Sequence, residues 1–182
     1  MDPIESMAND VSATQALLID KGEPSLSASV GRSLIKAVLL ASASYFENEI
    51  IALVREYVGS RTICDKVQAL VARKALSRQY HTFFDWDTGT NANTFFALFG
   101  DKFKEKFKSV VRNDPILESS IRDFLEIGRE RNRLVHQNFA SYSLEKTVDE
   151  LISLHGRAKR FIESFRAELF FEDGAEVPVV SS

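Results

Sequence analysis

The chain has 182 residues, of which 45% are apolar, and a formal net charge of −3. A chain of this length buries one sizeable core, so we expect a single folded domain. Fourteen Phe beside only 8 Gly and 4 Pro leave too few turn residues for an all-β fold, which favours an all-α protein.

Cysteine content and hydropathy indicate a cytoplasmic protein. Cys64 is the only cysteine, so no disulfide forms within the chain, and the N-terminus lacks the apolar segment of a secretion signal. Arg and Glu interrupt each apolar run before it reaches the ~20 residues that a membrane span needs. We therefore expect no membrane association.

The charge is divided unevenly between the ends and the body of the chain. Residues 1–25 have a net charge of −4, residues 172–182 of −3, and residues 26–171 of +4. A body this mildly basic is compatible with RNA binding but is also ordinary for a folded domain. We divide the chain into an N-terminal extension over 1–25, which could hold a short helix, a helical domain over 26–171, and an acidic flexible tail over 172–182.

Hydrophobic periodicity predicts the first helices of the domain. Apolar residues spaced three and four apart from Ile35 to Tyr57 predict a long helix that ends at Gly59. A second helix is predicted over 62–80, and a loop at 87–91 follows it. The predicted buried side of the second helix consists of Ile63, Val67, Leu70, Val71 and Leu76.

Four further helices are predicted after that loop. A short one over 93–99 is stopped by Gly100, and the next begins at Asp101 as its N-cap. Pro115 suits the first turn of the following helix, and the last helix begins at about Ser143. The whole pattern predicts a bundle of four to five main helices.

The helix that begins at Pro115 carries polar residues beside its apolar face. That face is centred near Gly128, with Asn132 about 40° from the centre, Arg131 about 60° to one side and His136 about 80° to the other. A buried amide without a partner costs about 1–3 kcal/mol, so Asn132 needs one, and His136 at i+4 is the nearest candidate. Arg131 and His136 therefore flank one apolar seam.

Arg131 and His136 lie about 140° apart on an ideal helix, too far apart to meet easily on one phosphate. Either the helix unwinds before His136, or a second copy of the chain packs along the seam and the two copies share a cleft. We favour the homodimer, because symmetric dimers are the commonest soluble homo-oligomers. A seam buried within one chain would argue against an enzyme.

The segment Arg131-Asn132-x-x-x-His136 resembles the signature of the HEPN superfamily, in which an Arg precedes a His by four to six intervening residues. The sequence Ala43-Ser44-Tyr45-Phe46-Glu47 and the helical layout are similar to the RiboL-PSP-like and neighbouring HEPN branches. Arg129 also stands at a permitted spacing from His136, although the adjacent Asn favours Arg131.

This resemblance implies a metal-independent endoribonuclease that acts as a homodimer on RNA, in a defence or toxin-antitoxin system. An antitoxin or another defence-system protein is a candidate partner. Arg131 would hold the phosphate, His136 would transfer protons, and Asn132 would position the histidine or the substrate. Attack by the 2′-OH of the RNA would leave a 2′,3′-cyclic phosphate. The alternative is a non-catalytic helical module that binds a protein or RNA.

Glu47 and a run of lysines are weaker candidates. Glu47 lies at the edge of the long helix's apolar face and could orient Arg131 or His136, although a solvent-facing acid is the commoner role. A second hypothesis assigns the RNA approach to lysines that alternate with aromatic residues, although solvated lysines give the same pattern. These lysines are Lys102, Lys104, Lys106 and Lys108.

No metal or cofactor site is predicted. His81, His136 and His155 are far apart in the sequence, and Cys64 has no ligand residue nearby. Neither a zinc-binding spacing nor a Cys-His nucleophile is therefore indicated. We expect His81 and His155 to be surface or core histidines.

Overall fold

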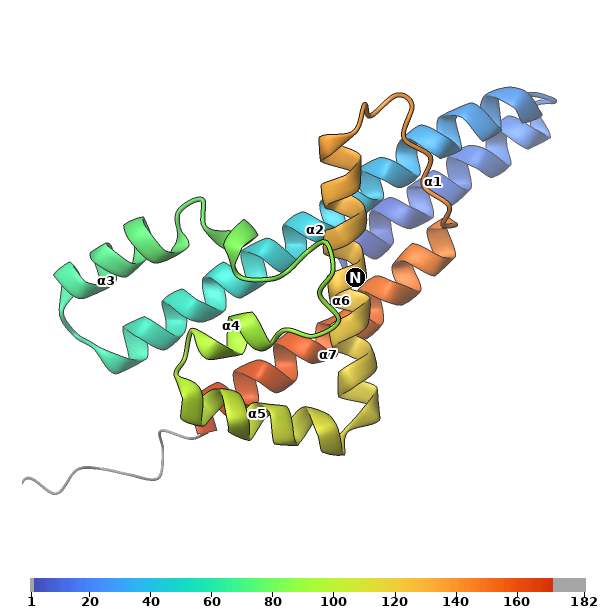
Figure 1. Ribbon diagram of the computed structural model, residues 1–182. Coiled ribbons are helices and arrows are strands. Elements are labelled where there is room, and N and C mark those ends of the chain that lie inside the picture. The colour runs from blue at the N-terminus through green and yellow to red at the C-terminus, as the bar shows by residue number, and fades with distance from the viewer. Residues whose placement is uncertain (1, 172–182) are drawn as a thin grey trace, which may run out of the picture.

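A computed structural model describes residues 2–171, and within that range the chain is a bundle of helices without a strand (Figure 1). This confirms the all-α prediction. The tail predicted over 172–182 lies outside the described residues. Five helices have 13 residues or more, namely α1 (Pro3–Asp20), α2 (Pro24–Arg61), α5 (Asp101–Asn113), α6 (Pro115–His136) and α7 (Val148–Phe171). The short helices α3 (Asp65–Val71) and α4 (Asn93–Ala97) lie between α2 and α5.

The long helix α2 runs through the bundle and packs against α1, α6 and α7. By length and composition alone it could cross a membrane. Ten of its 38 residues are buried in the bundle, and these form the side of α2 that faces the core. The buried positions include those predicted from the spacing, namely Ile35, Leu39, Ser42, Phe46, Ile50 and Leu53.

Phenylalanine rings fill the space between α2, α6, α7 and the segment around α4. Phe124 packs against Phe46 at a centroid distance of 5.5 Å and against Phe161 at 5.1 Å, in each case with the ring planes steeply inclined. Such edge-to-face pairs add about 0.5–1.5 kcal/mol to the burial of the rings. The high Phe content is therefore a property of the core.

The N-terminal segment is an integral part of the bundle and not an extension from it. α1 has 18 residues and buries Ile4, Ala8 and Val11 against α2 and α7. Asp2 caps α1 by accepting a 2.7 Å hydrogen bond from the Ile4 N–H. Only three buried residues of this helix follow the spacing of three and four, which is too few to predict its packing from the sequence.

The region after α2 differs from the predicted single helix over 62–80. α3 ends at Val71, and a single π-helical turn follows over Ala72–Leu76. α3 packs mainly on the end of α2 and on this turn, so much of its surface faces solvent. Of the side predicted to be buried, Leu76 is buried and Val71 half-buried, whereas the exposed residues are Ile63, Val67 and Leu70.

The last helix begins at Val148, five residues later than predicted. Thr147 and Glu150 form reciprocal hydrogen bonds, because the Glu150 N–H donates to Thr147 Oγ1 and the Thr147 N–H donates to Glu150 Oε2. This is a capping box, which satisfies two amide groups that have no partner within the helix. The Thr-x-x-Glu spacing in the sequence indicates this start of the helix, whereas the spacing of apolar residues does not.

Candidate functional site

The helix that carries the motif is regular from its first residue to its last. Asp114 caps α6 by accepting hydrogen bonds of 3.0 Å from the N–H groups of Ile116 and Leu117. At the other end, the Gln137 N–H donates to Arg133 O at 3.0 Å, and the helix ends at His136. Of the two arrangements considered for the motif, unwinding before His136 is therefore excluded.

The apolar seam of α6 is covered by the same chain. Phe124 and Gly128 are buried, and the indole of Trp86 lies on the backbone of Gly128. A second copy cannot pack along the seam at this level, because Trp86 already occupies it. The prediction that a dimer partner covers the seam around Gly128 is therefore wrong.

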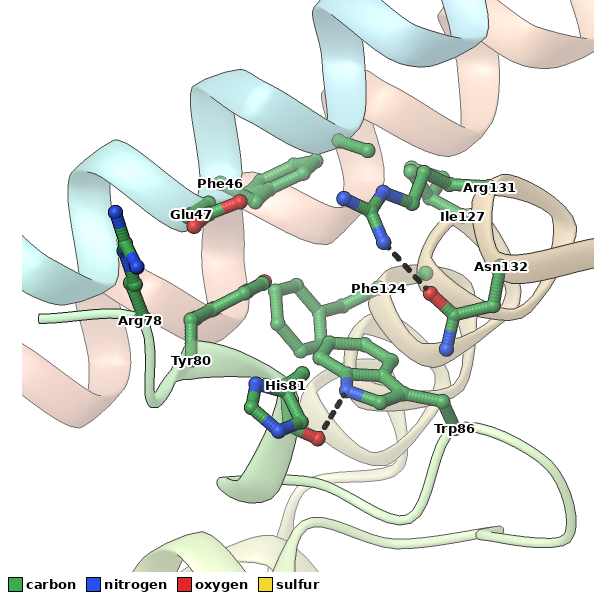
Figure 2. A pocket seen from close by; sticks show the side chains of 12 residues that line it. Phe46, Glu47, Arg78, Tyr80, His81, Trp86, Phe124, Ile127, Arg131 and Asn132 are labelled. Atoms are coloured by element: carbon green, nitrogen blue, oxygen red, sulfur yellow. Dashed lines mark hydrogen bonds between the residues drawn. The ribbon is translucent and has the colours of Figure 1, made fainter. Parts of the chain in front are cut away.

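A cavity of about 230 Å³ opens beside the seam, between α2, residues 78–86 and α6 (Figure 2). Arg131 and Asn132 lie in its wall and are half-buried. The Arg131 guanidinium donates a 3.0 Å hydrogen bond to Asn132 Oδ1. Asn132 was expected to pair with His136, but its partner is Arg131, because the adjacent side chains turn toward the cavity together.

His136 lies outside this cavity, on the exposed last turn of α6. Its neighbours Val135 and Phe139 are also exposed, at 53% and 45%. Lys36 of α2 is buried and donates a 2.7 Å hydrogen bond to the carbonyl oxygen of Phe139, which holds the chain after the helix in place. The structure thus separates Arg131 and His136 within one chain.

Glu47 lines the cavity that contains Arg131, whereas the exposed His136 is not part of that lining. Figure 2 shows the Glu47 carboxylate and the Arg131 guanidinium extending into the same space, with the Tyr80 side chain reaching toward it from the opposite wall. Burial, together with the nearby Glu47 carboxylate, raises the pKa of the Tyr80 phenol, and Arg131 opposes this shift. The phenol therefore remains a neutral hydrogen-bonding group.

Arg78, Tyr80 and His81 are lining residues that the sequence analysis did not assign to the site. They follow the π-helical turn, and Arg78 has a left-handed backbone with φ of 60°. His81 is exposed at the edge of the cavity, as the surface alternative predicted. These side chains follow one another on an irregular stretch of backbone, so helical periodicity provides no signal for them.

The sequence model of the RiboL-PSP-HEPN family matches residues 6–169. The chain belongs to this family. The match begins within α1, in agreement with the packing of that helix in the HEPN domain. No curated protein and no solved structure matches the chain. Because ribonuclease activity is common among HEPN domains, membership supports an RNase or nucleotide-related role at the level of the family.

Arg129 supports the loop of the HEPN domain that precedes α4. Its guanidinium donates a 2.9 Å hydrogen bond to the carbonyl oxygen of Gly89. Its buried Nε has no partner among the described residues. The same loop is tightened by Asp85, which accepts a 3.0 Å hydrogen bond from the Thr88 N–H. Arg129 therefore contacts the loop that carries Trp86 and does not line the cavity.

The four lysines lie on α5, at the end of α6 opposite the motif (Figure 1). The 16 residue steps from Pro115 to Arg131 correspond to about 24 Å of helix. Lys106 pairs with Glu168 at 3.2 Å and Lys108 with Glu105 at 2.9 Å. The fold therefore does not bring this run to the cavity.

The remaining histidine, His155, belongs to the core. Its Nδ1 lies 2.8 Å from Ser42 Oγ and its Nε2 lies 3.2 Å from Asp2 Oδ2. No group of three His, Cys, Asp or Glu side chains that could hold a metal occurs among residues 2–171.

Proposed function

We propose that this HEPN domain is a metal-independent endoribonuclease that uses Arg131, Asn132 and His136. The proposal rests on the surroundings of the Arg131 side chain. Its guanidinium is held by Asn132, lines an open cavity, and has no carboxylate partner among residues 2–171. A guanidinium in this state is available for a phosphate, which its planar donor fork fits well.

The proposed reaction transfers the phosphate within the RNA. The 2′-oxygen attacks the adjacent phosphorus as a base removes its proton, and the bond from phosphorus to the 5′-oxygen breaks as an acid protonates that oxygen. The products are a 2′,3′-cyclic phosphate and a 5′-hydroxyl. His136 carries a proton-transfer role, and Arg131 stabilises the charge that develops on the phosphate.

Two copies are needed, because one chain keeps Arg131 and His136 on different sides of α6. In the proposed dimer, the exposed turn around Val135, His136 and Phe139 contacts the second copy, and His136 of each copy approaches Arg131 of the other. Exposed apolar side chains beside His136 support this contact surface. This surface replaces the buried seam as the proposed interface.

Incubation of purified protein with RNA in excess EDTA tests the chemistry. Wild type is expected to yield cyclic-phosphate ends, whereas Arg131→Ala and His136→Ala each lower the rate by about 100-fold or more. Arg133→Ala is the matched control, because Arg133 is exposed and pairs with Glu130 at 2.9 Å on the same helix. No cleavage by wild type, or equal cleavage by all variants, contradicts the proposal.

A mixing experiment tests the shared cleft. If each site combines Arg131 of one copy with His136 of the other, a heterodimer of Arg131→Ala and His136→Ala retains one intact site. A statistical mixture then recovers about a quarter of wild-type activity. Recovery of none, or a strict monomer in light scattering, contradicts the composite site.

The proposed setting is a defence or toxin-antitoxin system in the cytoplasm, with a protein partner that restrains the nuclease. One observation favours a second candidate, a non-catalytic module that binds protein or RNA. The seam around Gly128 is buried within one chain, which is the arrangement that argues against an enzyme. Binding of RNA or a partner by wild type, without cleavage of any RNA, would support this alternative.

A further inference from the structure

We infer that the cavity between α2, residues 78–86 and α6 is a base-selective subsite that holds one guanine nucleotide of the RNA. The inference rests on the proposed function for the identity of the ligand as a unit of RNA. It adds three residues outside the Arg-to-His motif: Glu47, which selects the base, and Arg78 and Tyr80, which complete the wall of the subsite. The pocket belongs to a single chain, so it forms without a dimer.

The cavity contains charged groups that the protein does not neutralise. Glu47 and Arg78 line it, and no ion pair joins either of them to another side chain in the described part of the chain. The Arg131 guanidinium donates a hydrogen bond to Asn132 and to no other residue in the range 2–171. Glu130, which is half-buried like Glu47, by contrast pairs with Arg133 at 2.9 Å. Unpaired charges of both signs around one cavity fit a ligand that carries an anion and hydrogen-bond donors.

The backbone is distorted at the wall that supplies Arg78 and Tyr80. The π-helical turn Ala72–Leu76, the left-handed Arg78 and a short 3₁₀ turn at Tyr80–Thr82 follow one another within eleven residues. A non-glycine residue in the left-handed region costs about 1 kcal/mol or more, and such residues cluster at ligand sites. Here the distortion places both side chains at the cavity (Figure 2).

The inner surface of the cavity is aromatic. Phe46 and Phe124 are 1% exposed and Trp86 is 8% exposed, and all three contribute to the lining. Trp86 is fixed by a 3.1 Å hydrogen bond from its Nε1 to the carbonyl oxygen of His81. A planar base can stack against such rings, which is how proteins bind unstacked bases of single-stranded RNA.

The Glu47 carboxylate selects guanine among the four bases. Guanine presents two neighbouring N–H donors, at N1 and N2, and a carboxylate accepts both at once. Adenine and cytosine place a lone pair next to their amino group, and uracil places carbonyl oxygens on both sides of its single N–H. Adenine, cytosine and uracil therefore each place a hydrogen-bond acceptor against the carboxylate, which is itself an acceptor. Arg78 and Arg131 then bind the flanking phosphates.

Intrinsic fluorescence measures binding directly, because Trp86 is the only tryptophan of the chain. Wild type is titrated with the 3′-monophosphates of guanosine, adenosine, cytidine and uridine, and with inorganic phosphate as the phosphate control. We expect guanosine 3′-monophosphate to quench Trp86 and to bind at least about tenfold more tightly than the other three. Equal affinities for the four nucleotides, or no binding at millimolar concentration, overturn the inference.

Glu47→Gln is expected to reduce the preference for guanosine 3′-monophosphate to less than about threefold, because an amide offers a donor where guanine needs an acceptor. Glu49→Gln, on the same helix but outside the cavity, is the matched control and retains the preference. Circular dichroism verifies that both variants are folded. If Glu47→Gln is folded and keeps the full preference, Glu47 does not select the base and the inference fails.

Separate measurements of nucleotide binding and of RNA cleavage distinguish the failure of this inference from the failure of the proposed function. Selective binding of guanosine 3′-monophosphate without RNA cleavage supports the subsite and rejects the nuclease. Cleavage of RNA without any preference for guanine next to the cut supports the nuclease and rejects the subsite.

Discussion

The indole of Trp86 lies so close to Gly128 that a β-carbon on residue 128 would stand 2.0 Å from ring atom Cζ3. Real β-carbons do not approach carbon atoms this closely, so the ring and any larger residue at 128 exclude each other. The contact closes the apolar seam of α6 and fixes Trp86 in the wall of the cavity. A glycine in the middle of a helix usually weakens it, and here the close approach explains its presence.

Gly128→Ala is expected to destabilise the protein by about 1–3 kcal/mol, because Trp86 must move out of its packed position. Urea unfolding measures the loss, and a red shift of the Trp86 emission reports the displacement. Gly156→Ala is the matched control, since Gly156 also lies within a helix but a β-carbon added to it would meet no atom within 4 Å. The control is expected to gain about 0.5–1 kcal/mol. Equal effects of the two substitutions would contradict the packing argument.

Acid is expected to weaken the contact between α1 and α7. Burial opposes ionisation of Asp2, but hydrogen bonds from Lys159 and the Ile4 N–H outweigh it and lower the pKa of Asp2 to about 2. A lowered carboxyl pKa contributes stability above the unfolded value of about 3.9, and this contribution is lost as the pH falls toward 2. Burial also lowers the pKa of His155, so protonation below about pH 6.5 acts in the same direction.

Urea unfolding at pH 6 and pH 3 tests this linkage. Asp2 alone accounts for about 1 kcal/mol of the stability lost between these pH values, and Asp2→Asn removes that part of the loss. Asp20→Asn, at an exposed position near the other end of α1, serves as the control and leaves the pH dependence unchanged. A pH dependence that is identical in wild type and Asp2→Asn would contradict the assignment.

Lys36→Met is expected to release the chain that follows His136. The substitution leaves the Phe139 carbonyl without its 2.7 Å donor and removes the ammonium group that lies 5.0 Å from the Phe139 ring centre. We expect a loss of about 1–3 kcal/mol and faster hydrogen exchange in residues 137–142. Lys66→Met, at an exposed site on α3, is the control. Unchanged exchange in residues 137–142 would show that Lys36 does not hold this segment.

Arg78 and the α5 lysines are expected to differ in their effect on a short RNA. Arg78→Ala weakens binding of an RNA of about five nucleotides by about tenfold, because it removes a cation at the cavity. Lys102→Ala with Lys104→Ala changes the affinity by less than about twofold, since about 24 Å of α6 separates α5 from the motif and the screening length is about 8 Å. Fluorescence anisotropy at physiological ionic strength measures both, and the opposite order of effects would place the RNA on α5.

The periodicity of the sequence was sufficient for the fold class and for the core side of α2. Ile35 to Leu53 recur at intervals that only a helix places on one face, so the core side of α2 follows from the sequence alone. The start of α6 at Pro115 also follows from a local rule. The N-cap predicted at Asp101 is wrong, because Gly100 is the N-cap residue and Asp101, the first residue of α5, makes no side-chain capping hydrogen bond in the described part of the chain. Local rules also place Arg131 and His136 on different sides of α6, because the angle between them depends only on helix geometry.

Contacts between distant segments decided the rest. Whether the seam of α6 is free or covered depends on Trp86, which lies 42 residues before Gly128 and reaches it only through the fold. The cavity combines Glu47, Arg78 and Arg131 from three separate segments. No hydrophobic pattern in the sequence predicts the left-handed backbone of Arg78. The apolar residues of α3 were predicted to be buried because they are hydrophobic, but most of them are exposed. Burial also requires a neighbouring element that covers the residue, and the sequence does not show which element that is.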